Sequence, residues 1–365
     1  MGNALNVGII GAGKISGAYA TTFDRLSTVT LTSVADLDAG RAATLAAQYP
    51  GARAETPDEL LAADDVDVVL NLTVPQAHTA VTLAAIASGK HVYVEKPLTA
   101  TTAEARTVLA AAARAGRVVA CAPDTVLGTG VQTARASVAA GDIGTPIAAS
   151  AFMVTPGHER WHPAPEFYYQ PGGGPILDMG PYYLTALVTL LGPVRRVTGL
   201  SLTPRPTRTI GDGPRAGTVF PVHVATHVTG VLEHASGALT TLMMSFDVWE
   251  ARLPRIEVYG TEGTLSLPDP NGFDGPVRLF APGGDWAEIP ERAGYRNASR
   301  GCGVADLGRA LRTGTPPRAS GELAFHVLDV MECLLAAAGT GTAVEVASTC
   351  QIPAPVPFGA DPDDQ

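Results

Sequence analysis

The first 120 residues alternate strand and helix signals, and no other feature of the chain restricts its fold as strongly. Short apolar runs predict strands at 7–10, 29–35, 66–72 and 91–94. The segments between them predict helices at 16–25, 39–48, 76–88 and 101–115. Short strands separated by helices form right-handed β-α-β units and a parallel, doubly wound sheet. We therefore expect an N-terminal α/β domain of Rossmann type over residues 1–122.

A glycine loop, Gly11-Ala12-Gly13-Lys14-Ile15-Ser16, lies between the first predicted strand and its helix. Gly11 permits a tight turn, and Gly13 lets the backbone approach a pyrophosphate at the helix N-terminus. Asp36 ends the next strand, 23 residues after Gly13, and can accept hydrogen bonds from ribose hydroxyls. Gly11, Gly13, Lys14, Ile15 and Asp36 are thus candidate cofactor residues. Because a carboxylate repels a 2′-phosphate and no arginine follows it, we expect NAD rather than NADP.

Two further strand ends carry polar residues at the same edge of the predicted sheet. Glu95 and Lys96 follow the strand 91–94, and Thr73 and His78 follow the strand that ends at Leu72. Ligands of open α/β sheets bind at this carboxyl edge. A lysine there can donate to a reacting oxygen and stabilise a developing alkoxide. We expect all four side chains beside the cofactor, with Lys96 catalytic.

The sequence pattern changes after Cys121, where β-like runs and long helical segments replace the regular alternation of short strands and helices. We expect an α+β domain over 123–351, built on a large, mostly antiparallel open sheet, with helices at 181–191, 303–313 and 320–338. A segment at 201–218, rich in proline, threonine, arginine and glycine, predicts a surface loop. The tail 352–365 predicts an arm or a partly disordered end.

A glycine-rich cluster, Gly172-Gly173-Gly174, precedes a second set of candidate catalytic residues. Three glycines would let the chain lie close to a ligand. Asp178 and Tyr182 are four residues apart, so in a helix they share one face. A tyrosine hydroxyl near a lysine ammonium suits a proton relay. A loop that packs between domains is an equally good interpretation of this cluster taken alone.

The segment His158-Glu159-Arg160-Trp161-His162 has the spacing of a zinc-protease helix. Pro156, Gly157, Pro163 and Pro165 bracket it, so a helix of useful length cannot form there. We expect no metal site, and instead a loop in which Trp161 and His162 contact substrate or simply pack. His326, on an apolar helix, predicts a core residue rather than a site residue.

The composition excludes several classes of partner. A net charge of −10 without a long basic run disfavours nucleic acid and anionic membranes. The four cysteines are scattered, which indicates neither a disulfide framework nor a zinc knuckle. The N-terminus lacks a signal-peptide pattern, and no run of 18 apolar residues is free of charges and glycines. We therefore expect a cytoplasmic protein.

The glycine loop, Glu95-Lys96-Pro97 and Gly-Gly-Gly-x-x-x-Asp-x-Gly-x-Tyr, in this order and spacing, resemble the glucose–fructose oxidoreductase/inositol dehydrogenase/MocA (Gfo/Idh/MocA) family. The resemblance implies a Rossmann domain plus an α/β domain with an open sheet, through which homodimers or homotetramers form. It implies that Lys96, Asp178 and Tyr182 are the catalytic residues, with Tyr182 at a position that is often histidine. It also implies a sugar, glycoside or cyclitol substrate.

These observations together predict an enzyme that transfers hydride between nicotinamide and a secondary alcohol or ketone of such a substrate. One alternative is a lyase or glycosidase that uses the same step transiently and retains NAD. The other is a regulator that senses NAD without turnover, although sensing alone does not require Lys96, Asp178 and Tyr182.

Overall fold

A computed structural model describes residues 4–364, which leaves the first three residues of the expected first domain and the last residue of the tail outside it. The chain forms two compact units. The first contains residues 1–132, 291–325 and 353–365, and the second contains 133–290 and 326–352. The first unit therefore includes three segments, 123–132, 291–325 and 353–365, that the sequence-based division assigned elsewhere.

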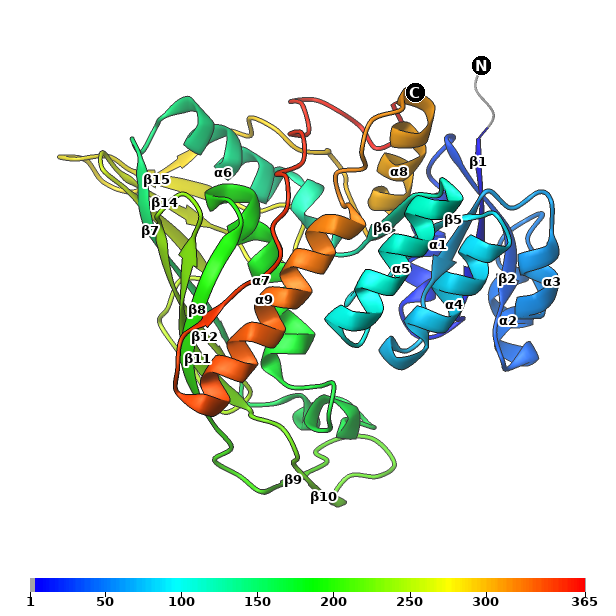
Figure 1. The fold of residues 1–365 in the computed structure, drawn as a ribbon, viewed down its shortest axis with the longest axis horizontal. Helices are drawn as coiled ribbons and strands as arrows, with labels where there is room; N and C mark the ends of the chain where they lie inside the picture. Colours follow the sequence, from blue (N-terminus) through cyan, green and yellow to red (C-terminus); the bar gives the residue numbers. More distant parts are fainter. Residues whose placement is uncertain (1–3, 365) are drawn as a thin grey trace. The chain divides into compact units, whose positions relative to one another are not determined.

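The first unit contains a six-stranded sheet of order β3-β2-β1-β4-β5-β6, in which all pairs are parallel (Figure 1). Its strands are β1 (Leu5–Ile10), β2 (Val29–Ala35), β3 (Arg53–Glu55), β4 (Val68–Asn71), β5 (His91–Val94) and β6 (Val119–Cys121). Its helices are α1 (Ser16–Phe23), α2 (Ala39–Ala46), α3 (Pro57–Ala62), α4 (Pro75–Ala87), α5 (Thr102–Ala115) and α8 (Cys302–Thr313). The predicted parallel, doubly wound sheet is confirmed.

Local sequence signals explain where several of these helices begin. Thr56 caps α3 with its side chain, and Glu59 returns a bond to the Thr56 backbone N–H, as in a capping box. Thr101 and Glu104 form the same device at α5. The α1 helix differs, since its N-cap residue Ile15 provides no side-chain hydrogen bond. Its first backbone N–H groups therefore receive no capping side chain.

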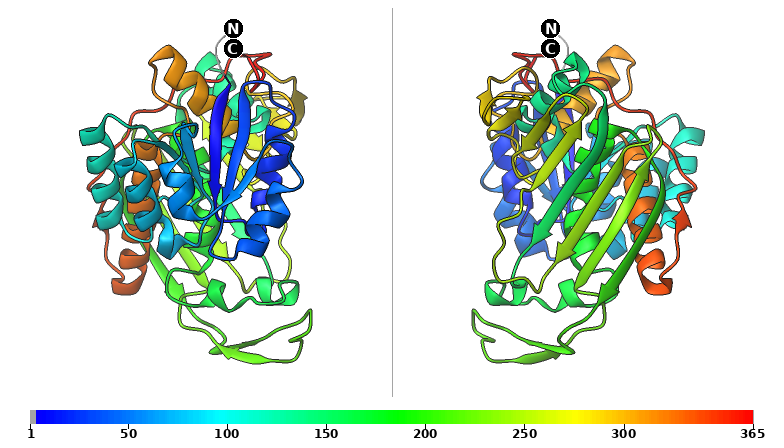
Figure 2. Two further views of the ribbon diagram at one scale, coloured as in Figure 1. Left: turned by 90° about the vertical axis from the view of Figure 1, so that its right-hand side faces the viewer. Right: turned by 90° about the vertical axis from the view of Figure 1, so that its left-hand side faces the viewer.

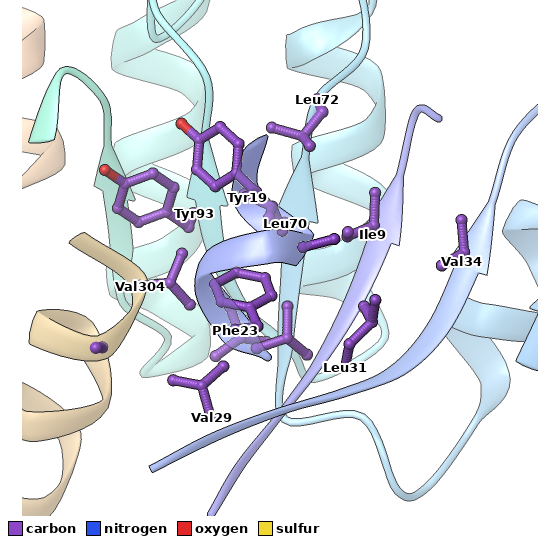
Figure 3. Packing of buried hydrophobic residues seen from close by; sticks show 14 of the residues in the cluster. Ile9, Tyr19, Phe23, Val29, Leu31, Val34, Leu70, Leu72, Tyr93 and Val304 are labelled. Atoms are coloured by element: carbon purple, nitrogen blue, oxygen red, sulfur yellow. The ribbon is translucent and has the colours of Figure 1, made fainter. Parts of the chain in front are cut away.

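The core of the first unit lies between its sheet and the helices α1 and α8 (Figure 3). Tyr19 and Phe23 of α1 point onto strand residues such as Leu70. Val304 of α8 enters the same cluster and is fully buried. Residues from the first strand and from beyond position 300 thus share one core.

Polar contacts join residues 291–325 and 353–365 to the rest of the first unit. The carboxylate of Asp124 accepts from the backbone N–H groups of Gly301 and Gly303, at 2.7 and 3.1 Å, and so caps the start of α8. Burial raises the pKa of Asp124. The expected free arm at 352–365 instead hydrogen-bonds its own unit, since the carboxylate of Asp363 accepts from the backbone N–H of Thr28 at 2.8 Å.

The second unit contains a nine-stranded sheet of order β16-β15-β14-β13-β7-β12-β11-β8-β17. Its strands are β7 (Pro146–Val154), β8 (Val194–Leu202), β11 (His227–His234), β12 (Leu239–Ser245), β13 (Ile256–Gly260), β14 (Thr264–Leu267), β15 (Val277–Phe280), β16 (Ala287–Ile289) and β17 (Val344–Glu345). Only the pair β7–β12 is parallel, so the predicted, mostly antiparallel sheet is confirmed. The helix α7 (Pro175–Leu191) packs on β7, β11 and β12, and the strands show their other face in the right-hand view of Figure 2.

The helix α7 begins six residues earlier than predicted. Pro181 suggested a first helical turn, but Pro175 occupies that position and Pro181 lies inside the helix. Gly180, just before the internal proline, is packed closely, because a Cβ there would lie 2.9 Å from the sulfur of Met331. The earlier start places both Asp178 and Tyr182 within one continuous helix.

The predicted loop at 201–218 is only partly irregular. It contains the short strand β9 (Thr207–Thr209), which pairs with β10 (Val219–Pro221) as a two-stranded ribbon.

The remaining elements are α6 (Thr129–Ala140), α9 (Gly321–Thr340) and the 3₁₀ helices η1 (Asp124–Leu127), η2 (His158–Arg160) and η3 (Glu166–Tyr169). By length and composition α9 could cross a membrane, but 56% of that window is buried inside the protein, as in a core helix.

Candidate functional site

The glycine loop turns tightly at the carboxyl end of β1. Gly11 has a φ of 107°, and a Cβ on it would lie 2.7 Å from the carbonyl oxygen of Leu72. Only glycine fits such a conformation at such a close approach. Gly13 differs, because a Cβ on it would meet no atom within 4 Å. Gly11 is therefore required by the fold itself, while Gly13 borders open space.

Asp36 is held directly against this loop. Its Oδ2 accepts from the backbone N–H of Ala12 at 2.7 Å, and its Oδ1 accepts from that of Asp38 at 2.8 Å. Each carboxylate oxygen has a further lone pair to offer, so the ribose-binding role predicted for Asp36 is compatible with these bonds. Leu37, the next residue, is 98% exposed and carries no charge.

Thr73 and His78 form the second corner of the sheet edge. The Thr73 hydroxyl donates to Oδ1 of Asn71 at 2.6 Å. His78 is buried, with Nδ1 2.7 Å from the Pro97 carbonyl oxygen and Nε2 3.0 Å from that of Thr73. Burial lowers the pKa of His78. A backbone carbonyl oxygen thus lies against each ring nitrogen, and the contact with Pro97 connects His78 to the Lys96-Pro97 turn. The predicted cofactor role of His78 stays a prediction.

Glu95 and Lys96 leave β5 in different environments. Glu95 is buried, accepts from the Tyr19 hydroxyl at 2.9 Å and accepts from the backbone N–H of Lys96 at 2.7 Å. Lys96 is half-buried. Glu95 thus fixes the backbone from which the lysine extends, and its predicted place beside the cofactor stays a prediction.

These features of the first unit fit a dinucleotide. The α1 helix offers backbone N–H groups that no side chain caps, and Gly13 leaves room for the backbone to be approached. The positive end of the helix dipole at this point favours phosphate. Gly11, Gly13, Lys14, Ile15 and Asp36 would hold NAD here, with Thr73 and Lys96 at the same sheet edge.

In the second unit, Asp178 is paired with a histidine. His158 Nε2 lies 3.0 Å from Asp178 Oδ2, and both side chains are largely buried. Because a carboxylate only accepts, Nε2 carries the proton in this bond. His158 Nδ1 is buried and has no hydrogen-bond partner among residues 4–364.

Aromatic rings enclose His158 on several sides. Its ring centroid lies 4.4 Å from that of Phe246, 4.5 Å from Tyr168 and 5.4 Å from Trp161. Such packing restricts the imidazole to one orientation. Asp178 accordingly has a rigid hydrogen-bond donor on one side.

Glu159, the residue after His158, joins the η2 turn to a buried network of charged side chains. Glu159 pairs at 2.9 Å with Arg208, which in turn contacts Asp247 at 2.5 Å, and the hydroxyl of Tyr169 also donates to Glu159. The three charged side chains are at most 8% exposed. A buried network in which each charge has a partner resists rearrangement, so η2 and His158 are held in place.

The other predicted residues of this unit lie on or near the same elements. Tyr182 is one turn after Asp178 on α7 and is 6% exposed. Trp161 is 49% exposed and His162 is half-buried, and their rings meet edge to face at 5.4 Å. His162 Nδ1 accepts from the backbone N–H of Ala164 at 3.1 Å. Lys96 belongs to the first unit, whereas Asp178 and Tyr182 belong to the second.

The structure describes both the glycine cluster and the segment upstream of it, and the upstream segment forms no helix of useful length, as predicted. The glycines serve the fold, since a Cβ on Gly173 would lie 2.5 Å from the Phe167 carbonyl oxygen and Gly174 has a φ of 89°. The zinc-protease spacing gives only the three-residue 3₁₀ helix η2. Residues 4–364 contain no group of three His, Cys, Asp or Glu side chains placed to hold a metal ion.

His158 is the site residue that sequence reasoning missed. It was considered only as half of a metal motif with His162. Its real partner, Asp178, lies 20 residues further along the chain and on a different element. No local spacing in the sequence signals such a contact.

Comparison with known proteins places this site in a family. Residues 5–122 match the oxidoreductase family with an NAD-binding Rossmann fold, and residues 131–266 match the GFO/IDH/MocA C-terminal domain. The dTDP-3,4-didehydro-2,6-dideoxy-alpha-D-glucose 3-reductase of Streptomyces antibioticus is 30% identical over 294 residues, 76% of this chain and 87% of that protein. The 1,5-anhydro-D-fructose reductase of Ensifer adhaerens is 31% identical over 265 residues, 71% of this chain and 74% of that protein.

Solved structures agree on the fold. An NAD-binding oxidoreductase from Klebsiella pneumoniae has a TM-score of 0.82 at 24% identity, over 95% of this chain and 100% of that one. A levoglucosan dehydrogenase in complex with NADH and L-sorbose has a TM-score of 0.80 at 19% identity, over 95% of this chain and 100% of that one. The chain belongs to the Gfo/Idh/MocA family of NAD-binding oxidoreductases. The predicted family, enzyme class and NAD cofactor are thereby confirmed.

Proposed function

We propose that this enzyme interconverts a secondary alcohol and a ketone on a sugar, glycoside or cyclitol, with Lys96, Asp178 and Tyr182 as its catalytic residues. The observation that carries the proposal is the buried Asp178–His158 pair, one helical turn before Tyr182. The two reductases that resemble this chain act on carbohydrates according to their names, which supports the substrate class.

Each chain residue has a separate task in the oxidative direction. Tyr182, as the phenolate, accepts the proton of the substrate hydroxyl and becomes the phenol. The Lys96 ammonium stabilises negative charge on that oxygen. Asp178, fixed by His158, accepts from a neighbouring substrate hydroxyl and orients the ring. Bound NAD supplies the acceptor for the hydride that leaves the same carbon.

Trp161 and His162 are proposed to contact the substrate. Trp161 presents an aromatic ring that is 49% exposed, a surface suited to the C–H face of a sugar. His162 lies edge to face with it at a centroid distance of 5.4 Å. Both residues flank the turn that carries His158.

A substrate panel with three variants tests the proposal. Sugars, cyclitols and their keto forms are incubated with NAD or NADH, and the absorbance of reduced nicotinamide is followed. Lys96→Ala and Tyr182→Phe should each lower turnover by about two to four orders of magnitude while NAD binding persists. Tyr183→Phe, one residue along the same helix, is the matched control and should retain turnover.

The panel also separates the rival readings. If Tyr183→Phe abolishes turnover and Tyr182→Phe does not, the proton donor has been placed one residue too early. Cofactor that stays bound and reduced without net turnover would instead indicate transient redox chemistry. Binding of NAD with no reaction on any substrate would favour a regulator.

The assembly and location of the enzyme form the second part of the proposal. The face of the large sheet opposite α7 carries Leu200, Leu202, Val231 and Leu239, which are 39–64% exposed. Apolar side chains on three neighbouring strands suit a protein interface. We therefore propose a homodimer or homotetramer formed through this sheet, acting in the cytoplasm.

A further inference from the structure

A polar cavity of about 350 Å³ lies in the second unit, between η2 and the strand β9. Its charged lining consists of Arg160, Arg205, Arg208 and Glu159, and the hydroxyl-bearing Thr207 and Thr209 flank Arg208 on the strand. Its size falls in the range of small-molecule binding pockets. None of these residues is among the proposed catalytic, cofactor or substrate residues.

The carboxylates at this cavity and next to it already accept hydrogen bonds from side chains of the protein. Glu159 accepts from Arg208 at one oxygen and from the Tyr169 hydroxyl at the other. Asp247, behind the cavity, accepts from Arg208 at Oδ1 and from the Thr226 hydroxyl at Oδ2. Arg208 is therefore neutralised by partners that are themselves satisfied.

The two remaining arginines have little negative charge near them. Arg205 reaches Asp247 only at 3.9 Å, and Arg160 has no carboxylate within 4.0 Å in the described part of the chain. Both guanidinium groups lie over the ring of Trp249 instead, at 4.6 Å for Arg160 and 5.9 Å for Arg205. Stacking on an aromatic ring fixes a guanidinium and leaves its in-plane donors available.

The surplus positive charge contrasts with the rest of the molecule. The chain has a net charge of −10, yet this lining contains three arginines and one carboxylate. Guanidinium groups match carboxylate and phosphate oxygens, and threonine hydroxyls add neutral donors. A cation would be repelled, and a neutral apolar ligand would leave the donors unsatisfied.

We propose that this cavity binds a small organic anion through its carboxylate or phosphate oxygens, with Arg160 and Arg205 as the principal ligands. Arg208 belongs to the scaffold that fixes their spacing, since its donors serve Glu159 and Asp247. The inference goes beyond the proposed oxidoreductase reaction and does not depend on it.

Calorimetric titration of the full-length protein at low ionic strength tests the proposal. The probes are inorganic phosphate, glucose 6-phosphate, gluconate and, as the neutral control, glucose. The Arg160→Ala/Arg205→Ala double variant should bind the anions at least about tenfold more weakly, the loss expected for a charge-assisted contact. Arg215→Ala is the matched control, because Arg215 pairs with Glu166 and does not line the cavity.

The outcomes distinguish the ligand sources and can overturn the proposal. Binding of phosphate and glucose 6-phosphate alone identifies a phosphate site, and binding of gluconate identifies a carboxylate site. The proposal fails if none of the three anions binds. It also fails if the double variant, with an unchanged melting temperature, binds like the wild type, or if Arg215→Ala weakens binding equally. Turnover on neutral substrates is a separate measurement, so failure here leaves the oxidoreductase proposal untouched.

Discussion

At the scale of single residues, the contact between His158 and Asp178 shows how a catalytic carboxylate can be fixed. The imidazole donates to Oδ2 of Asp178, and surrounding rings prevent it from turning away. His158 is therefore a positioning residue in this proposal.

Replacement of His158 should expose this role. His158→Phe keeps the packing but removes the donor, and we expect kcat to fall by about 10²-fold as Asp178 loses its orientation. His158→Gln retains an N–H near the same place and should recover part of that loss. Steady-state kinetics and melting temperatures of both variants are the measurements. Equal kcat values for Phe and Gln at equal stability would show that the hydrogen bond does not matter.

A second prediction for a single residue concerns Asp36, which we expect to determine the preference for NAD over NADP. Its carboxylate should repel a 2′-phosphate, and Leu37 offers no compensating charge. The Asp36→Ser/Leu37→Arg double variant should therefore shift the preference from NAD towards NADP. Calorimetric titration with both nucleotides checks the shift, and Leu37→Ala controls for loss of the side chain. Tighter binding of NADP than NAD by the wild type would contradict the assignment.

At the scale of helices and strands, the predictions from sequence were most accurate where residues adjacent in the chain determine the structure. The β2 and β5 strands occupy the predicted residues. The start of α7 could not be located, because Pro175 and Pro181 carry the same local signal for a first helical turn. The contacts of His158 with Asp178 and of His78 with Pro97 likewise join residues 20 and 19 positions apart, which no local sequence signal reveals.

His326 is a buried residue of α9 whose protonation affects the stability of the second unit. It is fully buried, its Nε2 accepts from the backbone N–H of Val194 at 3.0 Å, and Nδ1 lies 2.8 Å from the Ser348 hydroxyl. The core role predicted for it is confirmed. Burial lowers the pKa of His326 from 6.5 to about 4.

This lowered pKa predicts acid sensitivity. Between pH 6.5 and about 4 the unfolded chain binds a proton at His326 that the folded chain does not, so the free energy of unfolding falls as the pH falls through this window. The full loss from this group is about 3 kcal/mol. Urea unfolding at a series of pH values should show the decline, and His326→Gln should flatten it. An identical slope in the variant would assign the effect to other groups.

At the scale of the whole molecule, the apolar sheet face predicts self-association. Leu200→Glu combined with Val231→Glu places charge on two neighbouring strands of that face, β8 and β11, and should convert the oligomer to monomers. Sedimentation equilibrium measures the mass. Leu253→Glu is the matched control, since Leu253 is 43% exposed but lies outside the strands. A wild type that sediments as a monomer would reject this interface.

The discontinuous first unit affects how the protein can be synthesised and divided. Its boundary with the second unit is crossed at residues 132/133, 290/291, 325/326 and 352/353. Val304 shares a core with residues of β1, and Asp363 accepts a hydrogen bond from Thr28. The ribosome must therefore release these distant segments before the first unit can fold completely. Neither unit can be excised by a single cut, so gene fusions and domain exchanges in this enzyme must carry both units together or rejoin the chain at new points.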